Sequence, residues 1–519
     1  MRILKIEADS HHIRLYTDTD GAVRVRESVS TVGAKPGRTL SMEEAAATGG
    51  IIELQRCPNT NDRLYSRFTV YCGEEEAAGV RYVTDIAEDV PENTAPYPQP
   101  ATIKTLGAPP ELSKKLDIRQ GRLDINLPCL MTTMPGEDTI PYDFNGRTYY
   151  FRRSAVEKVD RQMQSVPITT MILLNSPRLF GSTGEKALLD ACIHPGFDWN
   201  SSEAFISAFD METEEGQGYY GAFVDFLAER YTRPDKKYGC AVGAIISNEV
   251  DSQYVWGNAG EMPVDQYVRE YTQALRLAWL CGRRHCSHFR VYISLDQFWC
   301  GANFNPAQTL RYYSGRTVLE LLNSIACSEG NFGWGVAYHP YPEDLKWADF
   351  WHDRAPDFTF STPKITFKNM EVLEAFLSQA DYLYRGQARR IVFSEQGFNS
   401  QDGPLRKLTE QMAAAGYVLA YLKARNMNTV DMFTHHSCID NPQEFGLNLG
   451  IFRYDPTKPE NVGEPKPICD SFLAMDTEKE AEAVERARAF IGEELFDYLL
   501  HPPVVYRERD TSKDNAFGG

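Results

Sequence analysis

The stretch Ala244-Ile245-Ile246-Ser247-Asn248-Glu249-Val250-Asp251 decides how the chain is interpreted. Three small or apolar residues run directly into a polar end. This pattern is typical of a short buried strand in a parallel sheet, where the carboxyl end of the strand opens into a cleft. A second stretch, Arg390-Ile391-Val392-Phe393-Ser394-Glu395-Gln396-Gly397, has the same form. We therefore expect Glu249 and Glu395 to stand at the ends of two different strands and to face one cleft.

The sequence around these stretches alternates between predicted strands and amphipathic helices. Val264–Leu280, for example, places Tyr267, Tyr271 and Leu275 on one helical face. The eight predicted strands are Leu123–Leu127, Thr169–Leu174, Phe205–Phe209, Val242–Ser247, Arg290–Leu295, Gly335–Tyr338, Ile391–Ser394 and Thr429–Thr434. Eight strands with intervening helices predict an α/β fold of the (β/α)8 TIM-barrel type. An open doubly wound sheet is the alternative, but no Gly-x-Gly-x-x-Gly turn follows the first strand.

The remainder of the chain is divided by composition. Residues 1–95 hold short runs of β-branched and aromatic residues between turn residues, and they predict a small sandwich-like β-domain. The proline-rich stretch Val90–Pro100 predicts a domain linker or an extended wrap, and we assign residues 96–114 to a Pro-rich linker. We assign residues 115–505 to the barrel, with Ala481–Leu500 as a closing helix, and residues 506–519 to a polar tail.

Composition narrows the classes of function. The chain has 519 residues, a net charge of −18 and no apolar run long enough to span a membrane. Nucleic acid and anionic membranes would repel so acidic a protein, so neither is an expected partner. The first residues show no secretory pattern, and the 11 cysteines are scattered. These features predict a cytoplasmic protein with reduced thiols and leave a homo-oligomer open.

The two glutamates carry a resemblance to a known clan of enzymes. Asn248-Glu249 at the end of the fourth predicted strand and Glu395 at the end of the seventh resemble the retaining (β/α)8 glycoside hydrolases of clan A. The order of motifs also resembles an uncharacterised bacterial family of such barrels with an N-terminal β-domain. The segments Arg63–Phe68 and Val80–Asp85 belong to that second likeness.

The resemblance implies a role for each residue of the motif. Glu249 would be the acid/base and Glu395 the nucleophile of a double displacement, with carboxyl groups about 5 Å apart. The acid/base must hold a proton near neutral pH, whereas the nucleophile must stay ionised. Asn248 could donate a hydrogen bond to the sugar 2-hydroxyl, a contact that strengthens as the oxocarbenium ion forms.

Other polar and aromatic side chains follow the predicted strands. In the clan a tyrosine after strand 6 sits beside the nucleophile, and Tyr341 resembles it; a rigid turn between prolines is the alternative. Where the clan often has a tryptophan on strand 8, this chain has histidines. Trp299 could stack on a sugar or belong to the core. The substrate-binding candidates are Asn248, Tyr341, His339, Asp296, Asn126, Trp256, Trp299 and His435.

The stretch from Cys281 to His288 holds two cysteines and two histidines, which raises a zinc site as a hypothesis. Its spacing fits no usual zinc finger, and it lies between a predicted helix and the fifth strand, on the side away from the cleft. We expect a solvated helix end there. No metal and no cofactor are predicted.

These patterns together predict a retaining glycoside hydrolase that acts on a β-linked glycoside or oligosaccharide. The alternative is a non-catalytic carbohydrate-binding barrel protein. A barrel lyase or aldolase would need a strand-end lysine or a metal cluster. The separation of the two carboxyl groups discriminates among these hypotheses: about 5 Å supports retention, and ~6.5–9.5 Å supports inversion.

Overall fold

Eight parallel strands form the centre of the protein. The computed structural model describes residues 1–31, 37–179, 185–301, 307–403 and 407–502. The strands run in the order β10-β20-β19-β18-β17-β16-β15-β11, and every neighbouring pair is parallel. Their bounds are β10 Lys104–Leu106, β11 Gln120–Asn126, β15 Ile168–Leu174, β16 Ala241–Ile246, β17 Arg290–Leu295, β18 Trp334–Tyr338, β19 Ile391–Gln396 and β20 Val430–His435. The predicted (β/α)8 TIM barrel with an N-terminal β-domain is confirmed.

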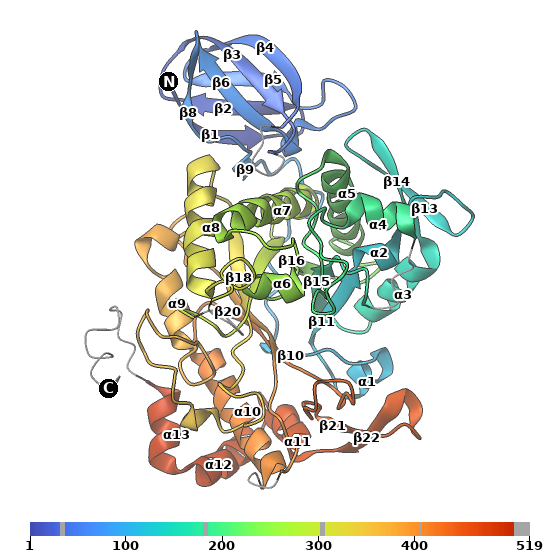
Figure 1. Cartoon of the computed structure of the whole chain (residues 1–519), viewed down its shortest axis with the longest axis vertical. Coiled ribbons are helices and arrows are strands. Elements are labelled where there is room, and N and C mark those ends of the chain that lie inside the picture. Colours follow the sequence, from blue (N-terminus) through green and yellow to red (C-terminus); the bar gives the residue numbers. More distant parts are fainter. Residues whose placement is uncertain (32–36, 180–184, 302–306, 404–406, 503–519) are drawn as a thin grey trace.

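The helices surround the strands, and most follow the strand they cover (Figure 1). Their bounds are α1 Pro110–Lys115, α2 Leu127–Leu130, α3 Arg153–Met163, α4 Lys186–Cys192, α5 Glu214–Tyr231, α6 Gln253–Trp256, α7 Val264–His285, α8 Gly315–Glu329, α9 Glu371–Leu377, α10 Thr409–Asn426, α11 Pro467–Ala474, α12 Glu480–Ile491 and α13 Glu493–Leu500. The expected closing helix is thus two helices. Gly492 separates them with φ of 101°, a conformation that glycine adopts most readily.

One predicted strand does not belong to the barrel. Residues 205–209 form isolated bridges to other loops, through Ser207 to Asn258 and through Phe209 to Ile193. They cannot enter the sheet because β15 pairs directly with β16, with Ile172 opposite Ile245. The missing strand is β10, which comes from the segment expected to be a linker and pairs with β20. Compared with the prediction, the sheet lacks the strand at residues 205–209 and contains β10 in addition. The number of strands before β16 is unchanged, so Glu249 still follows the fourth strand and Glu395 lies on the seventh.

The N-terminal residues form two sheets: β5-β2-β1-β8 with β9, in which β8 and β9 pair with β1 in parallel, and the antiparallel sheet β4-β3-β6-β7. Alternate residues of the longer strands point into a shared core, as Val23 and Val25 do on β3. The bounds are β1 Arg2–Ala8, β2 His12–Thr17, β3 Gly21–Ser28, β4 Thr39–Ala47, β5 Ile51–Gln55, β6 Arg67–Cys72, β7 Glu75–Glu76, β8 Ala78–Gly79 and β9 Asp85–Ile86. Short hairpins extend the barrel loops: β12 Met131–Thr132 with β13 Thr139–Phe144 and β14 Arg147–Arg152, and β21 Phe452–Tyr454 with β22 Val462–Pro465.

A buried carboxylate joins the β-domain to the barrel, where the β-domain rests beside α5, α7 and α8 (Figure 1). Asp225 on α5 is fully buried and accepts hydrogen bonds from Tyr65 of the β-domain at 3.0 Å and from Tyr142 at 2.6 Å. Arg284 and His285 at the end of α7 both pair with it at 3.1 Å. The expectation of a solvated helix end at residues 281–288 is therefore wrong, because these side chains are used for docking.

The opposite end of the barrel, away from the strand carboxyl ends, is closed by ion pairs. Arg390 and Arg290 both pair with Asp431, and Tyr97 lies against the Arg290 guanidinium at 3.4 Å. The expected polar tail, 506–519, lies outside the described residues. Within the described part of the chain, no helix combines the length and apolar character needed to cross a membrane.

Candidate active site

A cleft of about 1670 Å³ opens at the carboxyl ends of the barrel strands. This is the end where (β/α)8 enzymes build their sites, from the loops that follow the strands. Both glutamates line it, and they come from opposite sides of the barrel. The lining residues used below are Arg122, Asp124, Asn248, Glu249, Trp256, Asp296, Gln297, Tyr341, Glu395, His436 and Glu444.

The backbone turns sharply where β16 delivers Glu249. Ser247 and Glu249 have φ of 64° and 36°, in the left-handed region that side chains with a Cβ seldom occupy. The Glu249 amide donates to Ser294 Oγ on β17 at 3.0 Å, which holds the turn in place. Such strain persists only where the surroundings impose it, and it gathers at functional sites.

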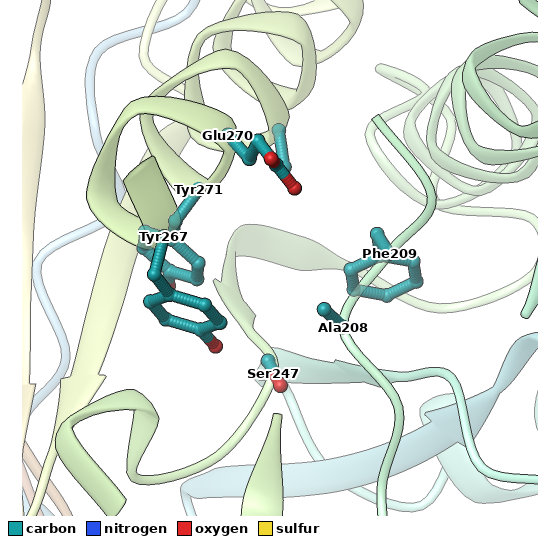
Figure 2. A pocket seen from close by; sticks show the side chains of 7 residues that line it. Ala208, Phe209, Ser247, Tyr267, Glu270 and Tyr271 are labelled. Carbon is teal, nitrogen blue, oxygen red and sulfur yellow. The ribbon is translucent and has the colours of Figure 1, made fainter. Parts of the chain in front are cut away.

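Helix α7 supports this turn from behind. Tyr271 donates to the Ile246 carbonyl at 2.6 Å, and Tyr267 donates to the Gly257 carbonyl at 3.0 Å. Figure 2 shows both rings and Glu270 around a small cavity above Ser247. At about 10 Å³ this cavity could hold no more than roughly one water molecule, so it is too small to be a substrate site. The predicted helical face of Tyr267 and Tyr271 thus serves to fix the strand end.

Glu395 on β19 is held by donors from two other strands. Arg122 on β11 donates to its Oε2 at 3.2 Å and to the Ser394 carbonyl at 3.1 Å. Tyr341, in the loop after β18, donates to its Oε1 at 3.2 Å. Both carboxyl oxygens therefore accept a hydrogen bond, one of them from a permanently charged guanidinium.

His339 lies between the two glutamates. Its Nδ1 is 2.7 Å from Glu249 Oε1, and its Nε2 is 3.0 Å from Ser394 Oγ. One oxygen of Glu249, one ring nitrogen of His339 and one oxygen of Glu395 all lie within 4.8 Å of one another. The end of the fourth strand and the end of the seventh are thus brought together at the centre of the cleft.

The two glutamates have opposite affinities for a proton. Burial raises the pKa of Glu249 well above its usual value, and the negative charges of Glu395 and Asp251 raise it further. Burial acts in the same direction on the pKa of Glu395, but the basic groups around it, His436, His339 and above all the permanently charged Arg122 with its hydrogen bond, outweigh burial and lower that pKa. Burial also lowers the pKa of His339, which favours a neutral ring. Arg122 is therefore the charge that keeps Glu395 ionised at every pH of interest.

Two further carboxyl groups stand behind Glu249. Asp296 donates its backbone N–H to Asp251 Oδ1 at 3.0 Å, and both side chains are almost fully buried. Burial raises the pKa of Asp251 to about 8, with the charge of Asp296 adding to the effect. Burial, and then the charge of Glu249, raises the pKa of Asp296. This part of the cleft is acidic, and its groups favour the protonated form.

Two clusters of the described residues hold enough donors for a metal ion: Glu249, His339 and Glu395 in the cleft, and His194, Glu212 and Glu270 beside the small cavity. In the second, His194 Nδ1 accepts the Gly196 N–H at 3.0 Å, so a neutral ring carries its hydrogen on Nε2, which faces Glu270 at 3.0 Å. In the first, both ring nitrogens of His339 are already within hydrogen-bonding distance of protein oxygens. In both clusters, therefore, the histidine nitrogens are already engaged with protein groups.

Several of the predicted binding residues lie in the cleft. Asn248, Trp256, Asp296 and Tyr341 line it, and Trp256 stacks on Phe205 with ring centroids 5.5 Å apart. His339 lies directly beneath, in contact with Glu249.

Three predicted binding residues lie elsewhere. Asn126 is buried and bonds the loop after β15 through the Ser176 carbonyl at 2.9 Å. Trp299 is fully buried and donates to the Phe360 carbonyl at 2.8 Å, so it is a core residue. His435 is buried beside Phe398 and donates to the Leu449 carbonyl at 2.8 Å. Its neighbour His436 lines the cleft instead.

Gln297, which follows Asp296 at the end of the fifth strand and could also bind sugar hydroxyls, lines the cleft, whereas sequence reasoning missed Arg122 and His436. A signal for Arg122 was present: Arg122, Asp124 and Asn126 alternate along β11, so that polar side chains fall at every second position of a barrel strand. For His436 the residue type carried no signal, because its neighbour His435 is also a histidine and only the direction of the strand end separates the two.

Comparisons with known proteins add a family and a set of similar structures. The family model described as "Family of unknown function (DUF5722)" matches residues 96–498. No curated protein matches the chain. A family 39 glycoside hydrolase from Bacteroides cellulosilyticus WH2 is similar at 12% identity and a TM-score of 0.44, over 91% of this chain and 81% of its own. A hyperthermophilic β-glucosidase from Pyrococcus furiosus is similar at 14% identity and a TM-score of 0.43, over 73% of this chain and 86% of its own.

Proposed function

We propose that this chain, which belongs to the DUF5722 family, is a retaining glycoside hydrolase that cleaves a β-linked glycoside or oligosaccharide with two glutamates. One observation carries the proposal: oxygens of Glu249 and Glu395 lie within 4.8 Å of each other at the mouth of the barrel. Retaining enzymes hold their two carboxyl groups about 5–5.5 Å apart, whereas inverting enzymes need ~6.5–9.5 Å to admit a water. The spacing in this cleft supports retention.

In the first step the ionised Glu395 attacks the anomeric carbon, and a carboxylate–sugar bond forms as the glycosidic C–O bond breaks. Glu249 gives its proton to the departing oxygen. The hydrogen bonds from Arg122 and Tyr341 to Glu395 support this assignment, because they keep the nucleophile ionised. The raised pKa of Glu249, caused first by burial, supports its role as the acid.

In the second step Glu249, now a carboxylate, takes a proton from a water molecule. The water oxygen bonds to the anomeric carbon, and the bond to Glu395 breaks. Two displacements on opposite faces return the original configuration. His339 would steady Glu249 through both steps from its position 2.7 Å away, and Asn248 would donate to the sugar 2-hydroxyl. Asp296 and Trp256 would contact the rest of the sugar.

The proposal is tested by the products that the wild-type protein makes. A panel of aryl β-glycosides is screened for release of the phenol, and ¹H NMR follows the anomer that appears first on any substrate that is cleaved. We expect the β-anomer first. An initial α-anomer would show inversion, and a protein that binds the glycosides without cleaving them would be a carbohydrate-binding barrel.

The nucleophile is identified independently by trapping. A 2-deoxy-2-fluoro glycoside with a good leaving group slows the second step, so that the glycosyl-enzyme accumulates. Peptide mapping is expected to place the added mass on the peptide that holds Glu395. A label on another carboxylate would contradict the assignment.

A further inference from the structure

We propose that the substrate is a chain of at least three sugars and that the bond cleaved lies inside the chain. One sugar would lie between the two glutamates. Its neighbour on one side would stack on Phe205 and Trp256, which form the acid-side surface. Its neighbour on the other side would lie against Trp347 and Phe445, which form the nucleophile-side surface. The inference rests on the proposed function and adds the class of the substrate.

The cleft is larger than one sugar requires. Its volume is about 1670 Å³, whereas pockets of about 300–1,000 Å³ already enclose a drug-sized ligand, which is larger than a single sugar. Residues from the loops after five of the strands, β15, β16, β17, β18 and β20, line it, so it extends across the mouth of the barrel. A single sugar at the glutamates would leave most of this space to water, and a chain would fill it.

The acid-side surface is a rigid unit beside Glu249. Phe205 and Trp256 both line the cleft and stack on each other with ring centroids 5.5 Å apart. The Phe205 N–H donates to the Val255 carbonyl at 3.0 Å, which joins the two loops that carry the rings. The Trp256 carbonyl accepts a hydrogen bond at 3.1 Å from Ser247, within the strained turn that holds the acid. The indole is therefore fixed relative to Glu249.

The nucleophile-side surface is exposed and comes from the loops on either side of β19. Trp347, after β18, has 37% of its surface exposed, and Phe445, after β20, has 74%. Leu345 is also exposed, and all three residues line the cleft. Single exposed apolar side chains are common, but several that gather in one cleft mark a place where a ligand binds.

The two loops of the nucleophile-side surface are joined to each other. Asn399 accepts the Asn448 N–H at 2.9 Å, and its side-chain amide donates to the Lys346 carbonyl at 3.1 Å. Phe445 has φ of 48°, in the left-handed region that bulky side chains seldom adopt. Such strain gathers at catalytic and ligand-binding sites. The surface is formed before the substrate arrives, which lowers the entropy lost on binding.

The two surfaces lie on opposite sides of the barrel mouth. The acid-side surface follows β15 and β16, the third and fourth strands, and the nucleophile-side surface follows β18 and β20, the sixth and eighth. Glu249 stands at the end of the fourth strand and Glu395 on the seventh, so the reacting pair lies between the surfaces. A substrate that touches both surfaces extends beyond the reacting sugar in both directions, and the bond that breaks is therefore internal.

A chain of sugars has the chemistry that such a cleft recognises. One face of a pyranose ring carries C–H groups, which pack on an aromatic ring, and the edge of the ring carries hydroxyl groups, which need polar partners. The cleft offers both kinds of contact, since polar residues such as Asn248, Gln308 and His352 line it together with the aromatic rings. An extended sugar chain is therefore the occupant that matches both surfaces and the pair of glutamates between them.

The length of the substrate is tested with chains of two to six sugars, built from β-1,4- or β-1,3-linked glucose, β-1,4-linked xylose or β-1,4-linked mannose and labelled at the reducing end. We expect kcat/KM to rise by about 5- to 10-fold with each sugar up to at least three, the gain from one aromatic contact. Chromatography should show shorter oligosaccharides among the first products of the longest chains.

Three results would overturn the inference and leave the hydrolase proposal intact. The first is a kcat/KM that does not change with chain length. The second is release of single sugars from one end of the chain only. The third is turnover of aryl glycosides of one sugar without cleavage of any of these chains.

The nucleophile-side surface is tested with Trp347→Ala and Phe445→Ala, whose exposed side chains can be shortened without opening the core. On the best chain kcat/KM should fall about 5- to 10-fold, whereas on the glycosyl fluoride of one sugar, which reaches neither surface, it should stay within about twofold of wild type. Trp199→Ala, at an exposed indole away from the cleft lining that the described residues form, is the matched control. An unchanged rate on the chain, or an equal fall on both substrates, would exclude this surface as a sugar site.

The acid-side surface is tested with Trp256→Leu, which keeps an apolar contact with Phe205 and removes the flat ring. The same two substrates are compared, and the same pattern is expected: a fall on the chain and little change on the glycosyl fluoride. An equal fall on both would show that Trp256 acts by supporting the turn at Glu249, and it would remove the acid-side surface from the inference.

Binding decides whether the two surfaces hold a chain even where nothing is cleaved. Failure to turn over any glycoside would count against the proposed function, and isothermal titration calorimetry would then compare methyl β-glycosides of one, two and three sugars from the same series. An affinity that rises with length in the wild type and rises less in Trp347→Ala supports the two surfaces. An affinity that does not depend on length, or no binding of any chain, overturns them.

Discussion

Glu249 and Glu395 are the same side chain at the same mouth of the barrel, yet their surroundings push their proton affinities apart. Glu395 accepts from Arg122 and Tyr341 and lies near His436. Glu249 has a neutral histidine at 2.7 Å and acidic groups beyond it. Both residues are glutamates at buried strand ends, so the residue type does not decide which is the acid and which the nucleophile. Side chains from the neighbouring strands and loops decide it, by raising one pKa and lowering the other.

Replacement of Glu395 should cause the largest loss of activity, because it removes one of the two contrasting glutamates. Glu395→Gln removes the attacking oxygen, so kcat/KM is expected to fall by about 10⁴-fold or more for every substrate, whatever its leaving group. Steady-state rates on aryl glycosides check this. Glu53→Gln on the β-domain surface is the control. A loss of less than tenfold would remove Glu395 as the nucleophile.

Replacement of Glu249 should give a loss that depends on the leaving group. In Glu249→Gln, glycosides of poorly acidic alcohols should lose about 10²- to 10⁴-fold, because their oxygen needs the proton. Glycosides of dinitrophenol leave without protonation and should lose much less in the first step. Plotting kcat/KM against the leaving-group pKa for both proteins measures the contrast. The same loss at every leaving group would contradict the role of Glu249 as the acid.

Removal of the Arg122 charge should make the two glutamates more alike. Arg122→Met takes a cation from Glu395, so the pKa of Glu395 should rise. Activity needs this group ionised, so the acid side of the kcat/KM profile should move to higher pH, while the basic side, set by Glu249, stays. At the optimum we expect a loss of about 10- to 100-fold, typical of a hydrogen bond to a charged group. A lower rate with an unmoved acid limb would indicate a purely structural role.

Chelation of metal ions should leave the activity of both glutamates unchanged. The histidine nitrogens of both clusters of metal-binding residue types already face protein groups, so prolonged treatment with EDTA is expected to change neither kcat nor KM. Metal content by mass spectrometry accompanies the assay. Activity that is lost on chelation and returns with zinc or manganese would assign an ion to His339 and the two glutamates.

The barrel and the central pair could be predicted from the sequence because both are encoded locally. A buried strand is an apolar run, and a residue at its end has to reach the mouth, as Glu249 and Glu395 do. The strand numbers of the two glutamates were also predicted correctly in spite of an error. Residues 205–209 were wrongly counted as a strand and β10 was not recognised, so the number of strands before Glu249 stayed the same. A three-residue strand in a proline-rich segment has too few residues to show a period.

The rest of the site depends on direction and distance, which single residues do not carry. His435 and His436 are adjacent and identical, and only the orientation of the strand end sends one into the core and the other into the cleft. Tryptophan is the residue type that often stacks on sugars, but Trp299 is buried in the core. Arg122 lies more than 270 positions from Glu395 in the sequence, and its role became visible only when the sheet placed β11 near β19.

The short strand β10 also determines where the protein can be divided. It begins at Lys104, close to residue 96 where the family match starts, so a chain cut at residue 96 would keep all the strands of its barrel. The same cut would remove Tyr65 from Asp225 and open a buried cluster of charges on α5 and α7 to water. The strand pairing of the barrel is complete without the β-domain. The buried charges around Asp225, in contrast, are covered only when both domains are present. Anyone who separates the two parts would have to redesign that surface.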